Sequence, residues 1–473
     1  MWPGPRAGQT IIPHTMRHLR RPLARFRRVL LGALVLAALA ATGCQSLGYY
    51  AQSVNGHLTL MNAARPVNDW LQDERTPPDL QARLQLAQQL RGFASQALHL
   101  PDNASYRRYA DLRRRAVVWN VAAAPPDSLT LKSWCFMVVG CVSYRGYFDE
   151  AEAQALGRQL AQQGWEVDVY PVPAYSTLGW LNWLGGDPLL STFIVYGEGD
   201  LAGLLFHELA HQQVYVDHDS AFNESYATAV ERLGVRQWLA TRPAEVREAH
   251  ARGQRHRREF RALQQRTREA LAALYARGGG APHAAAASAA ERGAGPEPDA
   301  SRRQATASQA SALGANRTNE SGLAGADRPA PPLTAGDLNQ APGEGENGPL
   351  DRAALLARKT QLMQDFAAQY RALQTDWAAR GEPDARHDRW VAKANNASFG
   401  LQSVYQGWVP AFEALFEGQG CDWPRFHAAV AELARQPRPA RDAALSRLAE
   451  GAAPAAVRQP ALAACRVFGS SVF

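Results

Sequence analysis

The feature that most constrains this chain of 473 residues is the pentapeptide His207-Glu208-Leu209-Ala210-His211. Two histidines four residues apart project from the same side of a helix, about one turn apart, so both imidazoles can reach one zinc ion. Glu208 lies between them, where its carboxylate can act on the water that the zinc activates. The pentapeptide therefore predicts a helix built around a catalytic zinc ion, as in zinc peptidases.

Apolar residues flank the pentapeptide at helical spacing, among them Leu201, Leu205 and Val214, which predicts a buried helix over residues 200–215. Asp200 is of a type that favours the N-cap position of such a helix. The alternative is an accidental match whose polar side chains are satisfied within the core. Because a chance match is expected in only about one chain of this length in a hundred, metal binding is favoured.

A catalytic zinc site takes three protein ligands, so a third must follow the pentapeptide. In the pattern HExxHxxGxxH it is a histidine, but here Val214 replaces the glycine, Asp217 replaces the histidine, and His218 comes one residue late. Glu224 begins a new helical run after the turn 217–220, and a second helix folding back would present it to the metal. Glu224 is therefore favoured over His218. The competing explanation is a first-turn carboxylate that the helix dipole favours.

The surrounding residues, LFHELAHQQVYV and FNESYATAVE, resemble a family of bacterial lipoproteins described as zinc aminopeptidases. The likeness covers most of residues 45–275, includes LPDNASYRRYADL and VPAYSTLGW, and resumes weakly from about 351. The chain is also similar to gluzincin peptidases. This resemblance implies zinc held by His207, His211 and Glu224, a peptide substrate, and Glu208 as the general base.

One position departs from the gluzincin pattern. Gluzincins often carry an Asp four residues after the ligand Glu, where it orients a ligand histidine, and this chain has Thr228 there. Either Thr228 orients the histidine more weakly, or another group such as Glu231, one further turn along the helix, does so.

Residues 1–43 read as a bacterial lipoprotein signal peptide. Six arginines lie within residues 17–28, an apolar run follows over 29–41, and Ala-Thr-Gly precedes Cys44. This resembles a lipobox and implies cleavage before Cys44 and acylation of its thiol. Gln45 rather than Asp after the cysteine indicates the outer membrane, with the protein facing the periplasm. The alternative is an ordinary secretory signal.

The net positive charge of the chain comes from the predicted signal peptide. The formal net charge is +7, and residues 1–43 contain seven arginines and no lysine or acidic residue. The mature chain is therefore close to neutral, and its composition does not indicate a nucleic-acid partner.

Four cysteines remain after Cys44, and in an oxidising periplasm two disulfides are expected, most simply between neighbours in the sequence. Three connectivities are possible. A cysteine zinc site is the alternative, but the spacings do not resemble a zinc ribbon. The predicted pairs are Cys135 with Cys141 and Cys421 with Cys465.

Between residues 114 and 197 the pattern changes to β-branched and aromatic runs, which predicts a small sheet leading into the active-site helix. The last extended run before that helix, Ala174 to Trp180, is a candidate edge strand for holding the substrate backbone. A core strand explains this run equally well. Strands are expected at 116–121, 136–143 and 165–172, with a helix at 149–163.

The remaining pattern is helical. Residues 243–277 and 351–380 predict two long helices that form an antiparallel hairpin. Between them the chain is rich in Ala, Gly, Pro and Ser, with few bulky apolar residues, which predicts disorder. The expected organisation is a signal peptide over 1–43, a catalytic region over 44–277, a disordered insertion over 278–350, and a helical part over 351–473 packed on the catalytic region.

The sequence thus predicts an α+β, zincin-like metallopeptidase domain with a small sheet, an active-site helix and an added helical hairpin. The favoured activity is that of an aminopeptidase, and the oxyanion donor is expected to be Tyr175, Tyr226 or Tyr405. An envelope endopeptidase and a non-catalytic zinc-binding lipoprotein are the alternatives. Glu208 argues against the latter, because a structural site has no use for a base. The oligomeric state stays open.

Overall fold

The structure is a computed structural model that describes residues 49, 52–136, 140–174, 176–177, 185–277, 350–403 and 407–451. The chain divides into two compact units, Met1–Thr59 and Leu60–Phe473. In the first unit the described residues are helical. The predicted signal peptide with Cys44, and all of the predicted insertion 278–350 except its last residue, lie outside the described residues.

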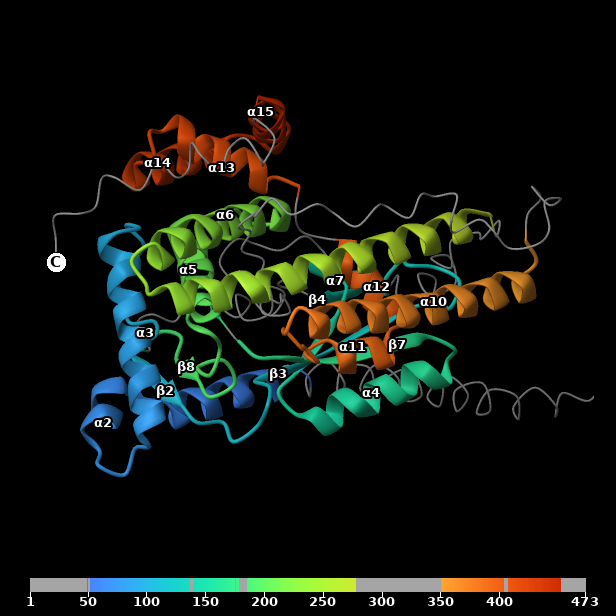
Figure 1. Ribbon diagram of the computed structural model, residues 1–473, viewed down its shortest axis with the longest axis horizontal. Coiled ribbons are helices and arrows are strands. Elements are labelled where there is room, and N and C mark those ends of the chain that lie inside the picture. The colour runs from blue at the N-terminus through green and yellow to red at the C-terminus, as the bar shows by residue number, and fades with distance from the viewer. Residues whose placement is uncertain are drawn as a thin grey trace, which may run out of the picture. The chain divides into compact units, whose positions relative to one another are not determined.

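The second unit combines many helices with small sheets, which confirms the predicted α+β class (Figure 1). In place of one small sheet, its described strands form three. The first contains β1 (Arg65–Pro66), β2 (Arg108–Ala110) and β8 (Leu189–Leu190); the second contains β6 (Arg145–Tyr147), β3 (Val118–Ala124) and β7 (Glu166–Val172); the third contains β4 (Trp134–Phe136) and β5 (Gly140–Val142).

Strand β3 is the centre of the second sheet, and all seven of its residues are buried. It pairs antiparallel with β7 over its full length, from Val118 opposite Val172 to Ala124 opposite Glu166. Helix α4 (Glu150–Gln162) packs closely on this sheet, because a Cβ atom at Gly157 would lie 2.9 Å from a Val169 methyl. The predicted helix and two of the predicted strands are therefore present.

The pentapeptide lies in helix α5 (Glu198–Gln213). Helices α3 (Pro78–Gln96) and α6 (Ser220–Leu239) pack against α5. Helices α5 and α6 approach so closely that a Cβ atom at Gly234 would lie 2.9 Å from the Phe206 ring. The N-cap of α5 is Gly197, so the prediction that Asp200 caps it is wrong. Asp200 lies in the first turn instead, where its carboxylate forms an ion pair with Arg257 at 2.8 Å.

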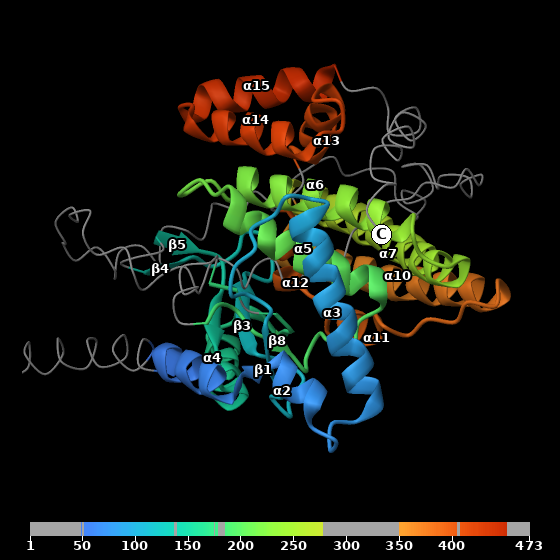
Figure 2. The ribbon, with the colours of Figure 1, turned by 90° about the vertical axis from the view of Figure 1, so that its left-hand side faces the viewer.

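The two predicted long helices are α7 (Ala244–Arg277) and α10 (Arg352–Ala379), which lie side by side in both ribbon views (Figures 1 and 2). Aromatic and aliphatic side chains from both helices form their own core, which includes Phe260, Leu263, Leu271, Phe366, Tyr370 and Trp377. Two short helices, α11 (Asp388–Lys393) and α12 (Asn396–Gly400), follow this pair, and α12 contacts β3 and β7.

Three more helices close the described chain: α13 (Val409–Gly418), α14 (Trp423–Arg435) and α15 (Arg438–Glu450). Helix α13 packs on α6, where Phe412 meets Phe222 with ring centroids 5.2 Å apart. The short helix α2 (Val67–Gln72) and the 3-10 turn η5 (Leu401–Ser403) complete the described elements that follow Thr59.

The disulfide between Cys135 and Cys141 joins β4 to β5, as predicted. Cys421 is also disulfide-bonded. Its predicted partner, Cys465, lies outside the described residues, so that pairing stays a prediction.

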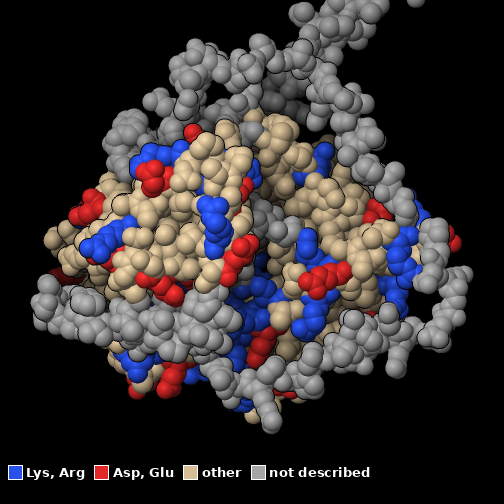
Figure 3. All heavy atoms as spheres, turned by 90° about the horizontal axis from the view of Figure 1, so that it is seen from above, with Lys and Arg blue, Asp and Glu red and all other residues tan. Residues whose placement is uncertain are grey.

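On the face that Figure 3 shows, Lys and Arg side chains are interspersed with Asp and Glu among larger uncharged areas. In the part of the chain that the structure describes, no helix is both long and apolar enough to cross a membrane.

Candidate metal centre

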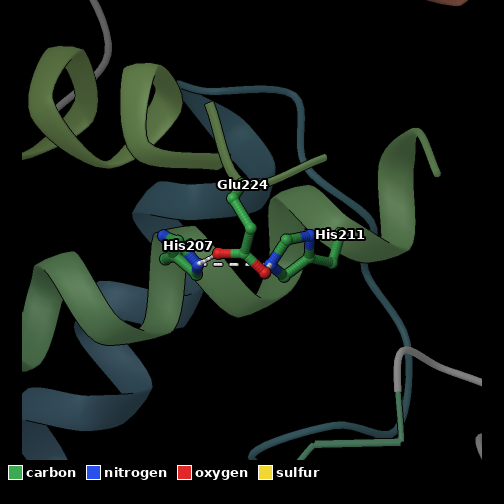
Figure 4. Close-up of side chains that lie close together, drawn as sticks. All are labelled: His207, His211 and Glu224. Atoms are coloured by element: carbon green, nitrogen blue, oxygen red, sulfur yellow. Dashed lines mark hydrogen bonds and ion pairs between the residues drawn. The ribbon is translucent and has the colours of Figure 1, made fainter. Parts of the chain in front are cut away.

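Helices α5 and α6 bring His207, His211 and Glu224 together. The two imidazole Nε2 atoms lie 3.1 Å apart. Glu224 Oε2 lies 3.4 Å from Nε2 of His207, and its Oε1 lies 3.6 Å from Nε2 of His211. Figure 4 shows the carboxylate pointing from α6 into the space between the two imidazoles of α5. All three side chains are buried.

This donor set fits a zinc ion. Neutral imidazole nitrogens and a carboxylate oxygen are typical ligands of catalytic zinc, and around a tetrahedral ion with bonds of about 2.0–2.1 Å the ligand atoms lie about 3.3 Å apart. The two Nε2 atoms lie 3.1 Å apart, and each faces a different oxygen of Glu224, at 3.4 and 3.6 Å, so the carboxylate spans the position of an ion bound to both imidazoles. Among the described residues this is the one group of His, Cys, Asp and Glu side chains with such convergence.

The alternative ligand, His218, lies in the turn between the two helices and apart from this group. His218 lies exposed in this turn with φ of 61° and does not belong to the group. Asp219 caps α6, because its carboxylate accepts a hydrogen bond from the Phe222 N–H at 3.1 Å. The Asn223 amide pairs with both backbone groups of Val216, each at 2.8 Å, and thereby fixes the start of α6. Glu224 therefore enters the site.

A distant residue also holds this turn. Arg441 of α15 donates a hydrogen bond to Asp219 Oδ2 at 2.5 Å, across 222 residues of sequence, and both side chains are buried. The Arg441 guanidinium also lies over the Phe222 ring, 5.2 Å from its centroid. The C-terminal helices thus fix the N-terminal end of the helix that carries Glu224.

Glu231 lies beside His207. Its Oε2 lies 3.2 Å from Nδ1 of His207, the nitrogen that points away from the metal position. Glu224, Thr228 and Glu231 follow one another at helical spacing along α6, and all three are buried. Glu231, seven residues after Glu224, is therefore in position to orient His207, as one of the two alternatives predicted.

Of the three predicted oxyanion donors, the structure describes Tyr226. Tyr226 is buried, and its hydroxyl bonds Nδ1 of His427 at 2.9 Å, away from the three ligands. Tyr175 and Tyr405 lie outside the described residues. The described phenol that borders the ligands is Tyr215, whose ring centroid lies 6.3 Å from that of His211.

Tyr215 stands just beyond the end of α5, four residues after His211, and its side chain is 38% exposed. Burial, followed by the charges of Glu224 and Asp217, raises the pKa of Tyr215, and a hydrogen bond with Asn223 opposes that rise. Its closeness to His211 in the sequence is a signal that could have identified it, although the chain leaves the helix at Val214.

A second phenol lies on the side of Glu208. Burial is the main cause that raises the pKa of Tyr106, and the charges of Glu208 and Asp187 raise it further. Glu208 itself is buried in α5. Tyr106 precedes Glu208 by about a hundred residues, and no local spacing in the sequence connects the two.

The candidate edge strand is described in part. Its residues Ala174, Ser176 and Thr177 are buried and are not in a strand, and the rest lies outside the described residues. The Thr177 N–H and the Ser176 hydroxyl both donate to the Asp187 carboxylate, at 3.0 and 3.1 Å. Burial raises the pKa of Asp187 to about 6.

Comparison with known proteins identifies one family. No curated protein and no solved structure gave a significant match. The model of the family described as "Putative aminopeptidase" matches residues 48–316 and 343–445, which include the metal-binding group and the helices around it. The chain belongs to this aminopeptidase family.

Proposed function

We propose that this protein is a zinc-dependent peptidase. The observation that carries the proposal is the convergence of two imidazole nitrogens and one carboxylate, all from buried side chains, in the arrangement of His207, His211 and Glu224. Imidazole and carboxylate are typical ligands of catalytic zinc. Membership of an aminopeptidase family supports peptide hydrolysis as the reaction. Glu208 supports a catalytic rather than a structural metal, because its carboxylate is not in the ligand group.

The residues of the chain then have separate roles. A bound zinc ion supplies Lewis acidity, which makes water more acidic and polarises a carbonyl group. Glu208 takes a proton from the attacking water and returns it to the leaving amine. Glu231 holds the His207 imidazole in the orientation that presents Nε2. Tyr215 donates a hydrogen bond to the oxygen that becomes negative as the peptide carbonyl is attacked.

The family favours an aminopeptidase over an envelope endopeptidase. An aminopeptidase requires the substrate amino group, so acetylation of a peptide's amino terminus should abolish cleavage. Equal cleavage of acetylated and free peptides by the zinc-loaded protein would instead identify an endopeptidase.

We also propose that the protein is a lipoprotein of the outer membrane that faces the periplasm, because Cys44 ends a lipobox-like sequence. Cys44→Ser should abolish labelling by a fatty-acid analogue and leave the precursor uncleaved. Normal mature protein in the membrane fraction of this variant would contradict the assignment.

The central experiment compares Glu208→Gln with wild type. Glu208→Gln should lose hydrolysis by several orders of magnitude and keep one zinc ion, because it removes the base and no ligand. Glu248→Gln, which changes an exposed carboxylate on α7, is the matched control and should leave the rate unchanged. Metal content and peptide cleavage are measured with and without a chelator. Full activity of Glu208→Gln would contradict the mechanism.

The role of Tyr215 has its own test. Tyr215→Phe should lower kcat by about a hundredfold or more with zinc affinity unchanged, as expected for loss of an oxyanion donor. Tyr196→Phe removes a phenol from the turn just before α5, at the other end of the helix, and should leave kcat unchanged. Equal rates for Tyr215→Phe and wild type would remove Tyr215 from the mechanism.

A further inference from the structure

The loop 102–106 lies between α3 and α5. On the α3 side, Arg91 Nε donates to the Ser105 carbonyl at 2.9 Å, and Gln88 donates to the Tyr106 carbonyl at 2.9 Å. The Arg91 guanidinium is buried and also donates to Asp102 at 2.6 Å. The loop is therefore fixed to α3 through backbone and side-chain groups.

On its other side the loop is bonded to α5 through Gln212. The Asn103 amide donates to Gln212 Oε1 at 2.7 Å, and the Gln212 amide donates to the Ser105 hydroxyl at 3.3 Å. Gln212 follows Glu208 by four residues, so the two side chains lie on the same face of α5, one turn apart. The loop thus covers the face of α5 that carries the general base.

Tyr106 ends this loop in an uncommon conformation. Its φ is 64°, in the left-handed region that non-glycine residues rarely adopt, and its side chain is buried. Its N–H donates to the Asp187 carbonyl at 2.6 Å, so both of its backbone polar groups are held. The backbone at Gly186 packs tightly against this loop, because a Cβ atom at Gly186 would lie 2.4 Å from the Ser105 nitrogen.

A left-handed backbone costs on the order of 1–3 kcal/mol and persists where the surrounding contacts enforce it, often at functional sites. The hydrogen bond between Gln212 and Ser105 holds the residue before Tyr106 within one helical turn of Glu208. The charge of Glu208 also contributes to raising the pKa of the buried Tyr106 phenol. We propose that Tyr106 is a positioning residue for Glu208, and that its phenol holds the carboxylate in the orientation needed for proton transfer. This inference rests on the proposed function, since it assigns a residue that acts through the base.

The test is a double-mutant cycle on the zinc-loaded chain. Tyr106→Phe should lower kcat by about tenfold to a hundredfold, as expected for a misplaced catalytic group, and change KM by less than about twofold. In the Glu208→Gln background the same change should alter the residual rate by less than about twofold, because there is no base left to position. Zinc affinity from chelator competition should equal that of wild type.

Tyr109→Phe is the matched control. Tyr109 is also buried, three residues along the chain in β2, where it packs against Trp70, and its loss of a hydroxyl should leave kcat unchanged. If Tyr106→Phe does not fold, Gln212→Leu provides the second variant. It breaks the bonds to Asn103 and Ser105 and should lower kcat with zinc retained.

The outcomes of this experiment distinguish the positioning role of Tyr106 from the proposed peptidase function. Equal kcat for Tyr106→Phe and wild type, or equal losses in both backgrounds, would overturn the positioning role alone. A zinc-loaded wild type that cleaves no peptide would overturn the peptidase proposal and this inference together.

Discussion

Two clusters built around buried histidines and carboxylates differ in how their donor atoms point. At the candidate metal centre, Nε2 atoms of His207 and His211 lie 3.1 Å apart and share one carboxylate. At His256 of α7, Nδ1 lies 3.0 Å from Asp384 and Nε2 lies 3.1 Å from Glu382. The first cluster converges on a point, and the second spreads its contacts around one ring.

The surroundings of His256 explain this difference. Its ring stacks on Trp377 with centroids 4.5 Å apart, and Arg255 also bonds Glu382 at 2.6 Å. The two ring nitrogens of His256 contact different carboxylates, and Arg255 shares Glu382 with His256, so the cluster joins α7 to the loop after α10. A buried histidine between two carboxylates therefore does not by itself indicate a metal site, and convergence of the donor atoms does.

The largest expected effect is on metal binding. Glu224→Ala should weaken zinc binding by about a thousandfold, since zinc–protein binding of about 10–16 kcal/mol is shared among a few ligands. Glu382→Ala, the matched change in the other cluster, should leave zinc affinity unchanged. Chelator competition measures both. If His218→Ala removed the metal and Glu224→Ala retained it, a histidine would be the third ligand and the comparison would fail.

Two further buried histidines, His387 and His427, should make the stability of the protein depend on pH. Burial lowers the pKa of His387 and of His427 to about 4 from an ordinary value of 6.5. The unfolded chain therefore binds protons at a higher pH than the folded chain does. The stabilising contribution is present above pH 6.5 and is lost as pH falls towards 4, on the order of 3 kcal/mol for each histidine.

Denaturant unfolding of the metal-free protein between pH 7 and 4 measures this contribution. His427→Gln should reduce the pH dependence of the free energy of unfolding by about half of the two-histidine contribution. An unchanged slope in this variant would show that His427 is not held neutral.

A smaller effect on zinc affinity is expected from Glu231, which contacts Nδ1 of His207. Glu231→Gln should reduce zinc affinity by about tenfold to a hundredfold, because it weakens the hydrogen bond that orients the imidazole. Thr228→Ala, one turn earlier on α6, should have less effect. The reverse ordering in a chelator titration would return the orienting role to Thr228.

The smallest effect, on protein stability, is expected at the cluster of His256, Glu382 and Asp384. His256→Gln should lower the free energy of unfolding by about 1–2 kcal/mol, because one buried hydrogen-bonding group is lost while Arg255 and Arg386 still pair with the two carboxylates. Zinc affinity should not change. Denaturant unfolding with a parallel zinc titration checks both, and a loss of zinc would mean that the two clusters are coupled.

The sequence predicted the parts of the site that depend on local spacing. His207 and His211 are one turn apart on a single helix, and Glu224 follows after a short turn, so helical periodicity was enough to bring the three together. The long helices α7 and α10 and the Cys135–Cys141 bond were predictable for the same reason.

The parts that failed depend on tertiary contacts. Asp200 suits an N-cap by residue type, but its ion pair with Arg257 across 57 residues places it inside the first turn. Tyr226 was a plausible oxyanion donor until the fold paired it with His427, 201 residues away. The loop that ends at Tyr106 reaches the face of α5 that carries Glu208 because it bonds Gln212 and α3, and no periodicity reveals these contacts.

The salt bridge between Arg441 and Asp219 determines how fragments of the protein should behave when they are produced separately. Every proposed ligand and the proposed base lie within residues 207–224, so a fragment ending before residue 350 would carry the whole of the proposed zinc chemistry. It would lack the guanidinium that fixes the start of α6. Such a fragment should bind zinc poorly on its own and recover when residues 350–473 are supplied as a separate polypeptide.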